Sequence, residues 1–442
     1  MGLVTDLRSS IYEEHADEAS FLYEQRGRWL EDAALSFDDV AELEQRREAH
    51  LDGLVLGGEA ALQLVAARAI ACEDAGIVDS SLRIACRHAR ADVCMQIVGA
   101  AAESGDAELL HGASDALCAE LPPALTTLAT DGLRSGDHTL VALWARVVGF
   151  RRLPLLAELR SALALSNVPP AHTAEIVWAL GELAEPCPLS CRAALSTGSP
   201  ALAQAVLLGT LKHSKLAGSD FELLEQSFPG WTAIPAVLAG VARYEALARV
   251  LRAADGDGRA QTVVALGLLG QARATPLLLE LLGDAEAARP AAVALQLLTG
   301  ASLLETEQIE APENPGLDAD LVDPDSEPAD DMPEPRASTV TRLCQDAGRW
   351  SACLSRVATA PLLRWGAPLS ELQTLHALSH TTLPLHVRGW LADELRIRLK
   401  HNIRFRPEMA IKEQRAALRA LHTSVTSGRS AAAAPSNSQQ RL

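Results

Sequence analysis

The sequence predicts an all-α protein, built as an α-solenoid of stacked helix pairs with further helical regions at both ends. Ala and Leu, which both favour helix, dominate the 442 residues, and aromatic residues make up only 4% of them. Runs of β-branched and aromatic residues that are typical of strands are scarce. Between residues 59 and 304, apolar segments alternate with short breaks that contain Gly, Pro, Asp or Ser. Many short helices joined by short loops favour a solenoid over a four-helix bundle.

The N-terminal region, residues 1–58, is expected to form two helices. Apolar residues recur at steps of three and four over 8–32, which is typical of an amphipathic helix. Ser36 is the expected N-cap of the second helix, because acidic residues fill the turn that follows it, and this helix should end near Gly57. His15 has glutamates beside it, but Zn²⁺ needs three or four converging ligands, so we interpret it as a surface histidine.

The solenoid region, residues 59–304, contains one stretch in which the helix boundaries are easy to read. This is "GRAQTVVALGLLGQARATPLLLELLGDAEAARPAAVALQLLTG", residues 258–300. A first helix should end at Gly270, and a second should begin near Pro276, whose missing N–H costs nothing in a first turn. The next helix pair should then start before residue 300.

The same stretch resembles the HEAT-like repeat. In that family an Asp in the turn and an Arg a few positions later support packing between adjacent units, and Asp284 and Arg289 match those positions. The resemblance therefore implies a structural role for both residues. A weaker copy lies at 174–186, and the spacing is close to the roughly 40–47 residues of such units. The fold class expected is thus an α-solenoid of HEAT-like helix pairs.

The segment 305–336 differs from the rest, because it has twelve acidic residues, one basic residue and hardly any apolar ones. Such a composition cannot offset the entropy lost on ordering, so we predict a disordered acidic linker or loop. Its many oxygen-bearing side chains could suggest a calcium loop, but the spacing and the glycine of an EF-hand are missing. Residues 337–424 should form a helical C-terminal region, and 425–442 a disordered tail.

The formal net charge of −18 is unevenly distributed. Residues 1–60 carry 15 acidic and 5 basic side chains, whereas 337–442 carry 15 basic and 6 acidic ones. This uneven distribution of charge can hold the two ends together by attraction, or it can create a charged surface that binds a partner. The overall acidity argues against general nucleic-acid binding. One basic cluster, "RIRLKHNIRFR", supplies candidate partner-binding residues that we expect on a solvated helix face: Arg396, Arg398, Lys400, Arg404 and Arg406.

No motif indicates catalysis. His376 and His380 are four residues apart, with His386 beyond a proline, but they lack the glutamate of the zincin pattern and an evident third ligand. Cys187 and Cys191 have the wrong spacing for a redox pair. A phosphate loop and a nucleophile elbow are also missing from the sequence. We therefore predict a protein without catalytic activity, cofactor or metal.

Targeting features are equally scarce. The eight cysteines are scattered singly, which is typical of free thiols in a reducing compartment. The first residues have neither a basic n-region nor an apolar h-region, and apolar runs are shorter than the roughly 18 residues of a membrane span. A cytoplasmic location without membrane insertion is the expectation.

The two ends resemble those of an uncharacterised bacterial HEAT-repeat family. The N-terminal likeness lies in "EEHADEASFLYEQRGRWLEDAALSFDDVAELEQRREAHLDGLVLGGEAALQL" at 13–64, where His15 is followed by acids, "FL", an Arg and then "AHLDGL". The C-terminal likeness lies in "APLLRWGAPLSELQTLHAL" and "VRGWLADELRIRLKHNIRF". Genes of this family are often found near type VI secretion loci, which implies an accessory role. No catalytic residues are assigned in the family, so none is implied here.

These observations predict a scaffold or adaptor that binds another protein, because stacked helix pairs present an extended concave face. The resemblance implies that this partner is a type VI secretion component or effector. Two alternatives stay open at this point: an immunity protein that masks a toxic effector, and an enzyme subunit of the lyase-like HEAT type. The sequence leaves the oligomeric state and the binding face open.

Overall fold

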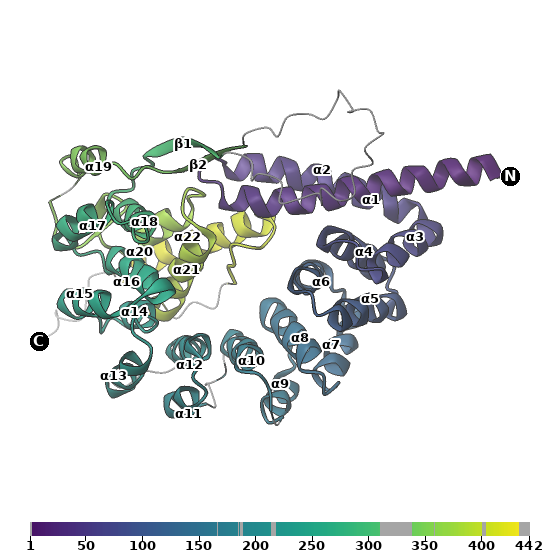
Figure 1. Cartoon of the computed structure of the whole chain (residues 1–442), viewed down its shortest axis with the longest axis horizontal. Helices are drawn as coiled ribbons and strands as arrows, with labels where there is room; N and C mark the ends of the chain where they lie inside the picture. The colour runs from purple at the N-terminus through teal and green to yellow at the C-terminus, as the bar shows by residue number, and fades with distance from the viewer. Residues whose placement is uncertain are drawn as a thin grey trace, which may run out of the picture.

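The computed structural model describes residues 2–165, 167–183, 185, 189–213, 218–309, 338–357, 359–399 and 404–432. Over these residues the chain is helical apart from two short pairs of strands, which confirms the all-α fold class. Figure 1 shows the helices arranged as an arc, with the N-terminal helices across one side and the C-terminal helices near the centre.

The N-terminal region is a hairpin of two helices, α1 (Gly2–Glu31) and α2 (Phe37–Leu56), that pack against each other. Ser36 is the N-cap of α2, as predicted, and its hydroxyl accepts hydrogen bonds from the backbone of Asp38 and Asp39. The Asp39 carboxylate accepts a bond from the Ser36 amide in return, at 2.8 Å, which completes a capping box. The helix ends at Gly57, close to the predicted position.

The solenoid consists of helices that alternate between an outer and an inner row. The bounds are α3 (Gly58–Ile70), α4 (Ala75–Arg87), α5 (Ala91–Ser104), α6 (Ala107–Glu120), α7 (Thr126–Leu133), α8 (His138–Arg151), α9 (Leu156–Leu163), α10 (Pro170–Glu182), α11 (Cys191–Ser196), α12 (Pro200–His213), α13 (Gly218–Ser227), α14 (Ala233–Leu238), α15 (Tyr244–Ala253), α16 (Gly256–Leu269), α17 (Thr275–Leu281) and α18 (Ala288–Thr299). The even-numbered helices α4 to α18 pack one against the next and form the inner row (Figure 1).

Small residues explain why these helices pack so closely. A Cβ atom added to Gly149 in α8 would lie 2.7 Å from the Cα of Ala179 in α10. A Cβ added to Gly267 in α16 would lie 2.6 Å from the Cα of Ala294 in α18. The predicted boundaries in this part of the chain are confirmed, because Gly270 ends α16 with φ +76° and Pro276 lies in the first turn of α17.

Among its described residues, the C-terminal region contains two pairs of short strands as well as four helices. Its elements are β1 (Leu304–Ile309), β2 (Ser338–Leu343), α19 (Ala347–Leu354), β3 (Leu363–Arg364), β4 (Ala367–Pro368), α20 (Glu371–Leu378), α21 (Leu385–Leu399) and α22 (Ile411–Ala432). Strands β1 and β2 are antiparallel, with Leu304 opposite Leu343 and Ile309 opposite Ser338.

The predicted disordered segments, the linker 305–336 and the tail 425–442, each begin too early. Residues 305–309 belong to β1, because a Thr- and Val-containing strand after the acidic segment supplies hydrogen-bonding partners for them. Residues 425–432 belong to α22, where Val425 is buried among the apolar side chains of the C-terminal region. The other parts of the predicted linker and tail, 310–336 and 433–442, lie outside the described residues.

The C-terminal helices lie against the inner row of the solenoid. Helix α21 packs on α12 and α14, and α22 packs on α2 (Figure 1). The β3–β4 hairpin binds the ends of α16 and α18: the amide of Leu363 donates to the carbonyl of Gly270 at 2.6 Å, and the amide of Trp365 donates to that of Leu297 at 2.8 Å. The chain therefore covers much of its own concave face.

Among the described residues, no single helix is long and apolar enough to cross a membrane. Helices α2 and α3 pass that test only when taken together, and they are bent by 116° where they meet.

Candidate functional site

Two arginines of the basic cluster bind inside the protein rather than pointing into solvent. Arg396, in α21, has 9% of its surface exposed, and its Nη1 donates to Glu182 Oε2 at 2.7 Å. Arg406 also donates to the Glu182 carboxylate. The expectation of a solvated, partner-binding face is therefore wrong for both residues. The physical reason is that Glu182, far away in the sequence, offers them a buried counter-charge.

The remaining members of the cluster have different surroundings. Arg398 pairs with Glu394, one helical turn earlier, at 3.0 Å. Arg404 donates to the backbone carbonyl of Phe150, at the end of α8, at 3.1 Å. Lys400 lies outside the described residues. Arg396, Arg404 and Arg406 thus fasten α21 and the segment after it to solenoid helices.

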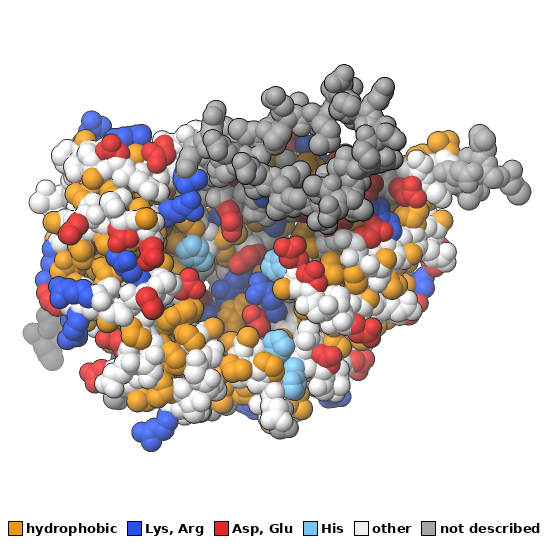
Figure 2. Space-filling model, viewed as in Figure 1, with side chains coloured by type: hydrophobic (Ala, Val, Ile, Leu, Met, Phe, Trp, Pro, Cys, Tyr) orange, Lys and Arg blue, Asp and Glu red, His pale blue; other side chains and the backbone are white. Residues whose placement is uncertain are grey.

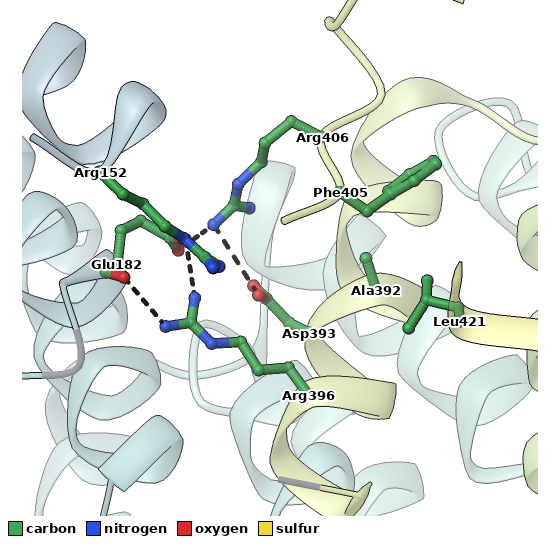
Figure 3. Close-up of a pocket in the computed structure, with 8 residues that line it drawn as sticks. All are labelled: Arg152, Glu182, Ala392, Asp393, Arg396, Phe405, Arg406 and Leu421. Carbon is green, nitrogen blue, oxygen red and sulfur yellow. Dashed lines mark hydrogen bonds and ion pairs between the residues drawn. The ribbon is translucent and has the colours of Figure 1, made fainter. Parts of the chain in front are cut away.

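Glu182, at the C-terminal end of α10, is the centre of this junction (Figure 3). Besides its bonds with the two arginines, the carboxylate accepts a bond from Lys212 Nζ in α12 at 2.8 Å. Burial alone would raise the pKa of Glu182, but the charges of Arg406, Lys212 and Arg396 outweigh it and hold this pKa far below its usual range. The carboxylate is therefore ionised at neutral pH although it is fully buried.

The acidic N-terminal hairpin and the basic C-terminal region meet directly. Arg26 Nη2 in α1 donates to the backbone carbonyl of Met409 at 3.0 Å, and its Nε pairs with Glu44 of α2 at 2.8 Å. The second carboxylate oxygen of Glu44 accepts a bond from the amide of Ile411, the first residue of α22, at 2.9 Å. Arg415 of α22 also pairs with Asp38 of α2, so the acidic and basic ends are in contact.

A cavity of about 620 Å³ remains between the hairpin, helices α4, α6 and α8, and α22. Figure 2 shows acidic and basic side chains gathered in the hollowed centre of the face shown. Seven basic and seven acidic residues line this charged cavity: Arg26, Arg47, Arg83, Arg146, Lys412, Arg415 and Arg419, and Glu44, Glu48, Asp79, Asp115, Glu120, Glu408 and Glu413. Its lining therefore has no net formal charge.

Several of these charges already have close partners. Arg47 in α2 is buried, pairs with the fully buried Asp79 of α4, and donates to the carbonyl of Ala19 at 3.3 Å. Arg83 of α4 lies 3.1 Å from Asp79, and it also donates to Glu120 at 3.2 Å. These pairs link α2, α4 and α6 along one wall of the cavity.

Among the charged groups that the inner-row helices contribute to the lining, Arg146 and Asp115 are less tightly paired. Arg146 in α8 has Glu175 as its ion-pair partner among the described residues, and their closest atoms are 3.9 Å apart. Asp115 in α6 accepts a hydrogen bond from the hydroxyl of Tyr23 at 3.1 Å and lies 3.4 Å from His111 Nε2. Burial raises the pKa of Asp115, and burial together with Asp115 raises that of Tyr23. Arg146 and Asp115 are thus the inner-row groups of the lining whose ion pairs are longest.

Asp284 and Arg289, the two residues that match the HEAT-like pattern, do not act together. Asp284 caps the turn after α17, where its Oδ1 accepts bonds from the amides of Glu286 and Ala287. Its other oxygen accepts a bond from Arg259 of α16 at 2.5 Å. Arg289 is exposed and takes no part in this contact. Asp284 thus contacts its own turn and α16, whereas the contact expected of Arg289 is wrong, because Arg259 reaches the turn from the neighbouring helix.

The histidine and cysteine patterns do not assemble a metal site within the described ranges, where no group of three His, Cys, Asp or Glu could hold a metal ion. His376 and His380 have their Nε2 atoms 3.3 Å apart and pack on the ring of Trp365. His386 packs edge-on against the Trp390 ring.

Two further motifs from the sequence are His15 with its neighbouring acids and the pair Cys187 and Cys191. His15 is less exposed than predicted, because its Nδ1 lies 3.0 Å from that of His50 on the neighbouring helix. Cys191 begins α11, and Cys187 lies outside the described residues.

Sequence reasoning missed Glu182, Lys212 and the lining of the charged cavity. The available signal was a polar residue inside an otherwise apolar inner-row helix, as for Glu182 in "VWALGELAEP" and Asp79 in "GIVDSSLRIA". Such a residue indicates a buried counter-charge without identifying it.

In comparisons with protein-family models, curated proteins and solved structures, this chain has no match.

Proposed function

We propose that this chain is a non-catalytic protein-binding adaptor that receives a segment of its partner in the charged cavity. Solenoids commonly bind through their concave face, and here α21 lies against part of that face, on α12 and α14. Among the described residues, the cavity between the N-terminal hairpin and α4, α6 and α8 is a part of this face that stays open. This opening is the observation that supports the proposal most directly.

The chemistry of the cavity favours a peptide that carries charges of both signs. Its volume lies within the range of about 300–1,000 Å³ that ligand pockets occupy. A lining with equal numbers of acidic and basic groups does not create the strong field that attracts a polyanion. Arg146 can bind a carboxylate or a backbone carbonyl of the partner, and Asp115 can bind a donor group.

The resemblance to a family encoded near type VI secretion loci makes a component or effector of that system the first partner to test. An immunity protein that masks an effector would use the same cavity and the same contacts. The enzyme-subunit alternative differs, because it requires a small molecule in the cavity.

The proposal is tested with a double variant, Arg146→Gln and Asp115→Asn, which removes both of these charges and leaves a polar amide at each position. We expect the double variant to lose the partner that the wild-type protein captures from its native host. The matched control is Arg134→Gln, because Arg134 pairs with Glu158 at 2.9 Å and is 65% exposed. This control should capture the partner as the wild type does.

Hydrogen exchange with the purified partner locates the contact. We expect slower exchange in α4, α6 and the first turns of α22. Protection confined to the outer row, or equal binding by the double variant, would contradict the proposal. A small molecule that raises the melting temperature of the wild type, but not of the double variant, would favour the enzyme-subunit alternative.

A further inference from the structure

Helix α22 presents a row of cations to the charged cavity. Three basic side chains follow one another at steps of three and four residues, which places them along one face of the helix: Lys412, Arg415 and Arg419. All three line the cavity, and we call them the cationic stripe. Another side of α22 packs into the protein through apolar residues such as Leu421 and Val425. The stripe is therefore the side that α22 leaves available for a contact.

Two members of the stripe are not neutralised within the described part of the chain. Lys412 and Arg419 are exposed, and neither has an ion pair or a side-chain hydrogen bond with another described residue. Arg415 pairs with Asp38, whose side chain is 89% exposed, so water weakens this pair. The stripe can therefore bind carboxylates without giving up a strong internal contact.

The acidic residues around the cavity are mostly engaged elsewhere. Glu48 of α2 and Glu120 of α6 each lie 2.5 Å from Arg87. Glu413, next to the stripe, lies 3.5 Å from Arg404. Glu408 also lines the cavity but forms no ion pair with the stripe, so it offsets at most one of the positive charges. The wall that α22 contributes thus keeps an excess of positive charge.

The spacing of the cations fits the acidic side chains of an extended peptide. A helix rises about 1.5 Å per residue, so Arg415 and Arg419 are roughly 6 Å apart along the axis. Side chains on one face of an extended segment recur every two residues, or about 6.6 Å. Acidic residues at alternate positions of such a segment would therefore meet successive cations of the stripe.

We propose that the cationic stripe binds an acidic stretch of a partner protein, in an extended segment that carries carboxylates at alternate positions. This inference rests on the proposed function and adds an orientation to it: the acids of the partner segment face α22, and its donor groups face Asp115. A protein segment is favoured over a nucleic acid because Glu48 and Glu120 line the same cavity and would repel a phosphate backbone.

Binding of a defined peptide to the full chain tests the stripe. The probe is a short, fluorescently labelled peptide that alternates aspartate and alanine, and the reference peptide has asparagine in place of each aspartate. Fluorescence anisotropy is measured at about 20 mM and about 300 mM salt, because exposed charges are screened at the higher concentration. We expect the aspartate peptide to bind at low salt and to dissociate at high salt, and the asparagine peptide not to bind.

A double variant, Lys412→Gln and Arg419→Gln, removes the two cations that have no partner. The loss of two exposed ion pairs should weaken binding of the aspartate peptide about 2- to 30-fold. The matched control is Arg252→Gln with Arg349→Gln, which changes the net charge equally at two exposed arginines outside the cavity lining. This control should bind the peptide as the wild type does.

Zero-length cross-linking shows where the peptide lies. A carbodiimide joins a carboxylate of the bound peptide to the amine of Lys412, one of four lysines in the chain, and mass spectrometry identifies the linked residue. We expect the link to concentrate at Lys412 at low salt. Its yield should fall in Arg419→Gln, because one of the cations that hold the peptide is missing.

Four outcomes would overturn the inference. These are equal binding of the two peptides, equal binding by the double variant and the control, and cross-links spread evenly over the exposed lysines. The fourth is tighter binding of a single-stranded oligonucleotide that the double variant loses, which would replace the acidic peptide by a nucleic acid.

Two further results separate this inference from its alternatives. A large rise in peptide affinity when Gly-Ser repeats replace residues 311–335 would identify the chain's own acidic segment as the occupant and overturn an external partner. Partner capture that depends on Arg146 and Asp115 but not on the stripe would overturn this inference alone and leave the proposed function standing.

Discussion

Replacing Glu182 with Gln tests whether the two halves of the molecule depend on one buried carboxylate. The substitution preserves size and removes a charge that Lys212, Arg396 and Arg406 share. Glu182 is 2% exposed, so the three cations cannot turn to water without opening the junction between α10 and α21. The effect should therefore be much larger than that of a surface ion pair.

The magnitude follows from the cost of leaving a buried charge unpaired. Removing one partner of a buried ion pair typically destabilises a protein by about 3–5 kcal/mol. Because Asp393 still compensates part of the positive charge, we expect a fall in the free energy of unfolding of about 3 kcal/mol. The control is Glu185→Gln, since the partner of Glu185 is the largely exposed Arg160. That change should cost less than about 1 kcal/mol.

The pH dependence gives a second readout of the same group. The folded-state pKa of Glu182 is held below that of the unfolded chain, so its contribution is present above the ordinary value of about 4.3 and is lost as the pH falls towards the folded-state pKa. Urea unfolding, followed by circular dichroism and tryptophan fluorescence, should show a shallower loss of stability in Glu182→Gln than in the wild type between about pH 5 and 3. Equal stabilities at neutral pH, or equal slopes, would refute the argument.

Three further predictions concern packing, the turn after α17 and the acidic segment. Gly267→Ala should lower the free energy of unfolding by about 1–3 kcal/mol, because its Cβ would lie 2.6 Å from the next inner helix. Gly99→Ala in α5, with nothing within 4 Å, should raise it by about 0.5–1 kcal/mol, and the opposite order in urea unfolding would contradict the close packing. Arg259→Gln should lower the melting temperature and Arg289→Gln should not, and equal values would show that the contact with the turn is dispensable. Limited proteolysis should cut first within the acidic segment, between residues 310 and 336, as the composition predicts. The fragments should elute together in gel filtration, whereas separation would contradict the closed arrangement of the chain.

Local features of the fold could be predicted because each depends on residues close together in the sequence. The Ser36 cap needs only the amides of the next three residues, and the end of α16 needs only a residue that adopts a positive φ, as Gly270 does. The start of α17 at Pro276 is of the same kind. The strand at 305–309 was missed because its hydrogen-bonding partner begins at residue 338, beyond a segment whose composition argues against order.

The candidate site was mostly beyond prediction for the same reason. Arg289 matched a repeat pattern, yet Arg259 binds the turn because it projects from the adjacent helix, 25 residues earlier. The basic cluster was visible as charge, but its surroundings were not: Arg396 and Arg406 are separated from Glu182 by more than 200 residues. The same charges on a solvated face would have little effect on stability.

The sequence by itself determined the all-α class, the alternation of short helices and most of their ends, since helix propensity, capping and apolar periodicity act over a few residues. Only the tertiary structure decided that the C-terminal region lies against the concave face, that the acidic and basic ends hold each other, and which carboxylates and guanidinium groups lie buried together. The free energy of a charged side chain depends on its burial and on the nearest opposite charge. Both are set by which distant surfaces meet when the solenoid curves.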